Sequence, residues 1–192
     1  EGIDITAGVV TIDNTVTTTN AGTVEITNSG TLTIAAAGDV SSDGTFTQNG
    51  TGTVSTAGDV TTTGDALTFT TAVTLTGSVA LSTGAGAGVV TLMSTVDGTA
   101  DFSQDLTITA GTGNVDLDAA VGSTTDLRDV QVVSGANVVA DSSIEARSVD
   151  TNSTNLTFSG AVTVTGNNAN GNADAVKVDA SNTVTIGGAI TA

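Results

Sequence analysis

The chain of 192 residues lacks cysteine, histidine, proline, tryptophan and tyrosine, and its only basic residues are Arg128, Arg147 and Lys177. Without histidine and cysteine, the usual zinc, haem and iron–sulfur ligand sets are excluded, as are Ser-His-Asp and Cys-His catalysis. Three cations against 20 acidic side chains, a net charge of −17, cannot neutralise a run of phosphates. The composition therefore argues against nucleic acid as a partner.

Long apolar runs and basic clusters are also missing. No stretch of 18 apolar residues is present, so the sequence predicts no membrane insertion, and no basic cluster draws the chain to an anionic membrane. The first residues, EGIDITAGVV, show neither a basic region nor an initiator methionine, which favours a mature product or an excised segment. The absence of cysteine fits a secreted β protein without disulfides, and it also fits the cytosol.

Threonine, glycine and aliphatic residues dominate what is present. The chain has 40 threonines and 24 glycines, while charged residues make up 12%. β-branched residues suit pleated strands, and Gly, Asn, Asp and Ser suit the turns between them. Segments that alternate polar and apolar residues recur from end to end, for example 23–27, 66–70 and 105–109, and none shows a long helical stripe. We therefore expect an all-β chain.

A repeat of about 22 residues runs along the chain. Residues 67–77 (LTFTTAVTLTG) return as 156–166 (LTFSGAVTVTG), with eight of eleven positions identical at an offset of 89. Four steps of about 22 account for that offset. Steps of 22, 23, 23, 23, 23 and 20 also connect a column of expected inward residues: Val24, Phe46, Phe69, Leu92, Val115, Val138 and Phe158.

Short strands and tight turns at this period predict that each repeat is one coil of a right-handed parallel β-solenoid. We expect a single domain over residues 1–192, with eight to nine coils of 20–23 residues. Stacked Asn and Thr side chains should form ladders of hydrogen bonds. An immunoglobulin-like sandwich is the alternative, but it does not explain the column. Neither end shows a polar or helical cap, which favours a segment of a longer rod or a subunit that stacks end to end.

Residues 31–50 (TLTIAAAGDVSSDGTFTQNG), 67–77 and 105–122 (DLTITAGTGNVDLDAAVG) resemble the repeats of filamentous-haemagglutinin-like proteins and of the β-strand-repeat surface proteins of bacteria. The similarity covers most of the chain and lies in its Gly-Asp and Gly-Asn corners and Thr-apolar-Thr strands. It implies a secreted or surface-attached right-handed β-helical rod that acts in adhesion, matrix or filament formation. It implies no active site that can be transferred residue by residue.

A solenoid enzyme that cleaves polysaccharides needs a clustered site, and the sequence offers none. Arg128, Arg147 and Lys177 lie far apart along the chain, as solvated surface charges do. Asp116 and Asp118 flank the inward Leu117 and should point outward about 7 Å apart, but no arginine, histidine or aromatic residue accompanies them. We therefore predict no catalytic residue and no enzymatic activity.

Calcium is the one cofactor that the residues suggest. Asp118 and Asp141 are 23 residues apart, so adjacent coils should stack two like charges that repel unless a cation or water intervenes. Residues 111–117 (GTGNVDL) are faintly similar to the calcium-binding β-roll repeat, which works only in tandem. The alternative is that aspartates next to glycine turn the corners, as at Asp39, Asp43, Asp59, Asp65 and Asp97. No metal ligand is assigned.

Thr-x-Thr triplets suggest ice binding through a flat array of hydroxyls. They begin at Thr15, Thr17, Thr31, Thr45, Thr51, Thr61, Thr68, Thr74, Thr107, Thr163 and Thr183. The array breaks after two coils when it is followed along the outward pairs that flank the expected column: Thr45/Thr47, Thr68/Thr70, Thr91/Met93, Asn114/Asp116, Asn137/Val139 and Thr157/Ser159.

The sequence can be examined for glycans as ligands and for glycans as covalent modifications. Carbohydrate binding by stacking is not expected, because Trp and Tyr are absent and Phe46, Phe69 and Phe158 should point inward. Glycosylation triplets begin at Asn49, Asn152 and Asn155, although such residues also turn corners.

The sequence thus predicts a non-enzymatic, extracellular structural or adhesive rod, secreted or on the cell surface. Its expected partners are copies or flanking repeats of itself, end to end, and a host or matrix surface. The alternatives are an ice-binding or a calcium-binding solenoid. No binding residue is assigned for any of these roles.

Overall fold

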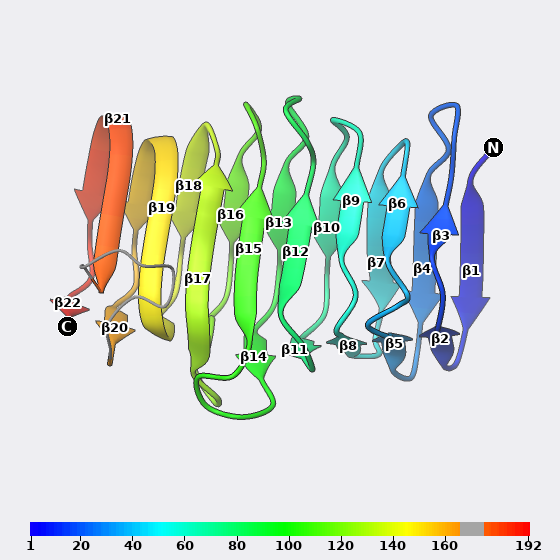
Figure 1. Ribbon diagram of the computed structural model, residues 1–192, viewed down its shortest axis with the longest axis horizontal. Coiled ribbons are helices and arrows are strands. Elements are labelled where there is room, and N and C mark those ends of the chain that lie inside the picture. Colours follow the sequence, from blue (N-terminus) through cyan, green and yellow to red (C-terminus); the bar gives the residue numbers. More distant parts are fainter. Residues whose placement is uncertain (166–174) are drawn as a thin grey trace.

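Successive turns of the chain stack through parallel strands in the computed structural model, which describes residues 1–165 and 175–192. Figure 1 shows the strands side by side along the long axis, with the two termini at opposite ends. Every strand pairing among the described residues is parallel, so the predicted β-solenoid is confirmed and the sandwich is excluded. Within these residues no helix is long and apolar enough to span a membrane.

Each turn contributes strands to three faces. The first face holds β1 (Ile3–Ala7), β4 (Val24–Asn28), β7 (Phe46–Gly50), β10 (Leu67–Phe69), β13 (Val90–Leu92), β16 (Val115–Leu117) and β18 (Asn137–Ala140). The second holds β2 (Val10–Ile12), β5 (Leu32–Ile34), β8 (Val54–Thr56), β11 (Val73–Leu75), β14 (Val96–Gly98), β20 (Val162–Val164) and β22 (Ile190–Thr191). The third holds β3 (Val16–Thr17), β6 (Val40–Ser42), β9 (Val60–Thr62), β12 (Val79–Ser82), β15 (Asp105–Thr109) and β17 (Leu127–Ser134).

Two long strands run around corners near the C-terminal end. β19 (Ile144–Phe158) pairs with β20 on the second face, with β17 on the third and with β18 on the first. β21 (Val176–Ile186) continues from the third face to the first. The regular alternation of short strands and corners therefore changes in the last turns, where the faces merge into continuous ribbons.

The turns vary more in length than the sequence predicts. Residues in register on the first face are separated by 21, 22, 21, 23, 25, 23 and 18 residues: Ile3, Val24, Phe46, Leu67, Val90, Val115, Val138 and Leu156. Pairing of Val184 with Leu156 adds one more strand, so the predicted number of coils is close. The turn of 25 residues contains the six-residue loop 99–104, and the turn of 18 residues is short because β19 rounds a corner without a loop.

The interior is a single aliphatic core that follows from alternation along each strand. Eleven of the 22 strands in the described chain have three residues, of which the outer two are buried and the middle one faces out, because successive side chains point to opposite faces. The seven residues of the predicted inward column are all buried. The three phenylalanines among them are the largest side chains in the core.

The predicted column is nevertheless wrong in register. Phe69 lies beside Gln48 of the preceding turn, and the partner of Phe46 is Leu67. Val115 likewise pairs with Val90 rather than with Leu92. A shift of two residues keeps every side chain on the same side of the strand, so the polarity pattern alone does not distinguish the two registers.

Ladders of polar side chains connect the turns, as the sequence predicts. Asn137 donates its amide to Asn114, Asn155 to Asn137 and Asn182 to Asn155, each at 2.8 Å. Inside the core, an inward column of hydroxyls satisfies carbonyl groups at one corner: Thr18, Ser42, Thr62 and Thr83. Four successive turns therefore close this corner with a hydrogen bond from an inward hydroxyl to a carbonyl group of the same turn.

Replacing Phe69 tests the core. Its ring packs against Phe46 with centroids 5.2 Å apart, so Phe69→Ala should lower the free energy of unfolding by about 3–5 kcal/mol, measured by urea denaturation. Met93→Ala, at an exposed position on the same face, is the control and should change stability by no more than about 0.5 kcal/mol. Equal stability of the two variants would place Phe69 outside the core.

Two glycines at the same corner test how closely the turns approach. A Cβ on Gly52 would lie 1.7 Å from the carbonyl oxygen of Gly30, whereas a Cβ on Gly8, two turns earlier, would meet nothing within 4 Å. Gly52→Ala should therefore destabilise the protein by about 1–3 kcal/mol through overpacking. At a concentration at which the chain is monomeric, Gly8→Ala should leave the melting temperature unchanged, and a similar loss in both variants would contradict close stacking at this corner.

Candidate functional site

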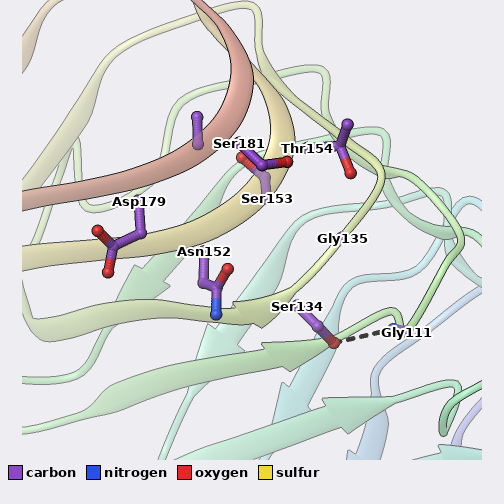
Figure 2. A pocket seen from close by; sticks show the side chains of 9 residues that line it. Gly111, Ser134, Gly135, Asn152, Ser153, Thr154, Asp179 and Ser181 are labelled. Atoms are coloured by element: carbon purple, nitrogen blue, oxygen red, sulfur yellow. Dashed lines mark hydrogen bonds between the residues drawn. The ribbon is translucent and has the colours of Figure 1, made fainter.

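A cavity of about 440 Å³ lies where the third face turns into the first, across β17, β19 and β21. Figure 2 shows the side chains that line it from three successive turns. Its polar lining consists of Ser134, Asn152, Ser153, Thr154, Asp179 and Ser181. The cavity thus gathers hydroxyls, one amide and one carboxylate.

The cavity forms because the regular stacking breaks at this corner. The register between β19 and β21 shifts between Ser153 and Asn155, so one strand carries an extra residue there. Such bulges bend a strand and redirect its side chains. The Gly111 N–H donates to the Ser134 hydroxyl at 3.0 Å (Figure 2), and Thr154 N–H donates to the carbonyl oxygens of Gly135 and Ala136.

Ser153 is the residue of the cavity whose hydroxyl is buried in the described structure and has no hydrogen-bond partner. It is 6% exposed, and among the described residues its Oγ and that of Thr151 are the buried side-chain oxygens without a hydrogen bond. A buried hydroxyl that lacks a partner loses its hydration without compensation. Of the two, Ser153 lines the cavity and Thr151 does not.

One cation stands beside the cavity and is already paired. Lys177 Nζ lies 2.5 Å from Asp179 Oδ2 and 3.7 Å from Asp150 Oδ1. The hydrogen bond to Asp179, followed by the charge of Asp150, raises the pKa of Lys177. One ammonium faces two carboxylates here, so Lys177, Asp150 and Asp179 together keep a net charge of −1 beside the cavity.

The three basic residues do not meet in one site. Arg128 forms a two-pronged ion pair with Asp105 of the preceding turn, Arg147 is exposed, and Lys177 belongs to the corner of the cavity. The hydrogen bonds that Arg128 donates to Asp105 raise the pKa of the guanidinium. The structure therefore brings together no pair of cations that could act on one acidic sugar.

Three aspartates do approach one another on the first face. Leu117 pairs with Ala140, which places Asp118 beside Asp141 in the adjacent turn, as predicted. Burial raises the pKa of Asp116, and the charges of Asp118 and Asp141 raise it further. In the described part of the chain, no group of three acidic side chains is arranged to hold a metal ion. Calcium binding stays a prediction.

The aspartates beside glycine serve as hydrogen-bond acceptors between turns. Asp39 accepts the N–H of Asp59 at 2.9 Å, and Asp59 accepts that of Ala80 at 2.7 Å. Asp43 and Asp97 bind backbone N–H groups of neighbouring turns in the same way. These contacts support the interpretation that the aspartates turn and fasten the corners.

The outward hydroxyls form longer columns than the sequence indicates. On the third face, six successive turns stack a hydroxyl at the same position: Thr17, Ser41, Thr61, Ser82, Thr109 and Ser134. The neighbouring outward column carries Asp39, Asp59 and Ala80. The hydroxyl array on this face is therefore one residue wide, and the ice-binding alternative depends on that single column.

The glycosylation triplets occupy different surroundings. Asn155 belongs to the asparagine ladder, and Asn49 donates to Glu25 at 3.1 Å. Asn152 is exposed at the cavity. The sequence identified Asn152 only as the first residue of a glycosylation triplet. Its place in a cavity was missed, because no local sequence pattern predicts a shift in register.

Two aspartates with opposite pKa shifts allow a test by pH. The Ala21 N–H and the Thr63 hydroxyl lower the pKa of Asp43, so its ionised form stabilises the fold above the ordinary value of 3.8, and this gain is lost as the pH falls through the lowered pKa. The pKa of Asp116 is raised, so its ionised form opposes folding above the raised value, and the penalty vanishes as the pH falls below 3.8.

Asn replacements should therefore shift the melting temperature in opposite directions. At neutral pH, Asp43→Asn should lower the melting temperature and Asp116→Asn should raise it. Both differences should shrink when the melts are repeated in acid. Shifts of the same sign at neutral pH would contradict the assignment.

Comparisons with known proteins assign no family to this chain. No family model matches it, and neither a curated protein nor a solved structure matches it. The resemblance to filamentous-haemagglutinin-like repeats is therefore one of sequence texture, and function has to be argued from geometry.

Proposed function

We propose that the protein is a non-enzymatic structural rod that extends by stacking end to end with further copies of itself. The observation that carries this proposal is the unbroken series of parallel strand pairs along the long axis (Figure 1). Apolar side chains in line with the interior are exposed at the last described turn. Val184, Ile186 and Ile190 are exposed to 45%, 51% and 39%.

Strand pairing along the axis gives the rod its stiffness. Each turn is hydrogen-bonded to the next through its backbone, so bending requires many such bonds to lengthen together. The continuous aliphatic core adds burial at every turn. The net charge of −17 opposes lateral association of rods.

The two ends carry matching aliphatic positions. Successive pairings place Ile3 and Val184 in one inward column, and Ile5 and Ile186 in the next. Val10 and Ile190 likewise share a column on the second face. A second copy that continues the stack would therefore set aliphatic residues of its first turn over those of the last.

Edge strands at the ends also favour this partner. β1 and β21 each pair through one edge with a neighbouring turn of the described chain, which leaves a row of backbone groups facing along the axis. Joining the first turn of one copy to the last turn of another is a head-to-tail contact. Because head-to-tail contacts along one axis do not close into a ring, they generate filaments.

Location and adhesion belong to the same proposal. An acidic, cysteine-free rod of this shape suits a secreted or cell-surface protein that spans distance or presents a surface to a host or matrix. The sequence texture shared with bacterial surface repeats supports that location. The rod itself would act mechanically, without a cofactor.

End-to-end stacking is tested by charge at the exposed end. The wild type should associate as its concentration rises in sedimentation velocity and should form fibres one rod wide in electron micrographs. Ile186→Asp should abolish this association, because a charge that faces an apolar partner is costly. Val133→Asp is the control, since Val133 is 43% exposed on β17, along the third face. A wild type that stays monomeric, or a loss of fibres in both variants, would overturn the proposal.

A further inference from the structure

The cavity across β17, β19 and β21 has no role in a rod held together by strand pairing. We propose that it binds a neutral saccharide through hydrogen bonds. Its lining gathers the hydroxyls of Ser134, Ser153, Thr154 and Ser181, the amide of Asn152 and the carboxylate of Asp179. Hydroxyls and amides both donate and accept hydrogen bonds, and the hydroxyl groups of a sugar ring do the same, so the two sets can pair.

The charges around the cavity select against other ligands. A phosphate or an acidic sugar would meet Asp179, while the nearby ammonium of Lys177 is already bound to Asp179 and Asp150. A divalent cation would find a single carboxylate in the lining, and that carboxylate is paired. Among the lining side chains only Ala180 is aliphatic, so an apolar ligand would gain little.

The volume of the cavity suits a small ligand. At about 440 Å³ it lies near the lower end of the range for small-molecule sites, roughly 300–1,000 Å³, which is enough for one or two sugar rings. No aromatic residue lines the cavity, so a sugar would bind through hydrogen bonds alone, without stacking on an aromatic ring, and its affinity should be weak.

Ser153 is the residue that points to a missing ligand. Its buried hydroxyl has no hydrogen-bond partner, although it belongs to the lining. A serine hydroxyl turns about a single bond, so a rotamer change brings Oγ toward a sugar hydroxyl in the cavity. The bulge between Ser153 and Asn155 creates the space at this position.

Thr151 supplies a matched control on the same strand. Its hydroxyl is also buried without a partner, yet Thr151 lies outside the lining. Ser153→Ala and Thr151→Val each remove an unsatisfied hydroxyl, so both should leave the free protein as stable as the wild type or more so. They should differ only in their effect on the saccharide.

The experiment titrates glucose, mannose, galactose and N-acetylglucosamine into the isotope-labelled protein and follows backbone amide signals by NMR. At least one sugar should shift the amides of Ser153, Thr154 and Ser181 at millimolar concentration. Ser153→Ala should weaken that response about tenfold, as expected for one hydrogen bond, and Thr151→Val should leave it within about twofold.

Two results would overturn the proposal: none of the four sugars shifts these amides, or the two variants lose the response to the same extent. Melting curves of both variants confirm that the fold is retained. The titration detects a site within one chain, so its outcome is independent of whether the rods associate end to end.

Discussion

Hydrogen bonding between the backbones of successive turns is the interaction on which the rest of the structure depends. In-register parallel pairing sets each residue about 4.8 Å from its counterpart in the next turn. Every position is therefore surrounded by the same position of its neighbours. Aliphatic residues then build a continuous core, and asparagines such as Asn114, Asn137 and Asn155 satisfy one another in a ladder.

In-register stacking sets like charges of successive turns close together, where they repel. The acidic residues show how the chain reduces this repulsion. Asp39 and Asp59 accept backbone N–H groups of the following turn, and Asp105 binds Arg128. Asp116, near Asp118 and Asp141, has a raised pKa because burial and their charges oppose its ionisation. Asp43 is thus stabilised at a corner, where N–H groups are available, whereas Asp116 is penalised on a face.

Departures from regular stacking create the features that differ from a plain rod. The loop 99–104 lengthens one turn, and β19 rounds its corners without a loop, which shortens another. The register shift between Ser153 and Asn155 accompanies a polar cavity at the corner that four earlier turns close with inward hydroxyls. A mechanical fold can therefore carry a binding site without changing its core.

Local alternation and the period of about 22 residues were enough to predict the strands, the parallel solenoid, the burial of Phe46, Phe69 and Phe158, and the asparagine ladder. The strands, the parallel solenoid and the burial follow from the pattern along the chain, and a two-residue slip leaves them intact. The asparagine ladder also needs the register that sets Asn137 between Asn114 and Asn155. The pairing of Phe69 with Gln48, the length of each turn and the cavity beside Ser153 were decided by the tertiary structure. They depend on contacts between residues about twenty positions apart. The register of these contacts is set by bulges and by the lengths of the corners, which the local alternation does not predict.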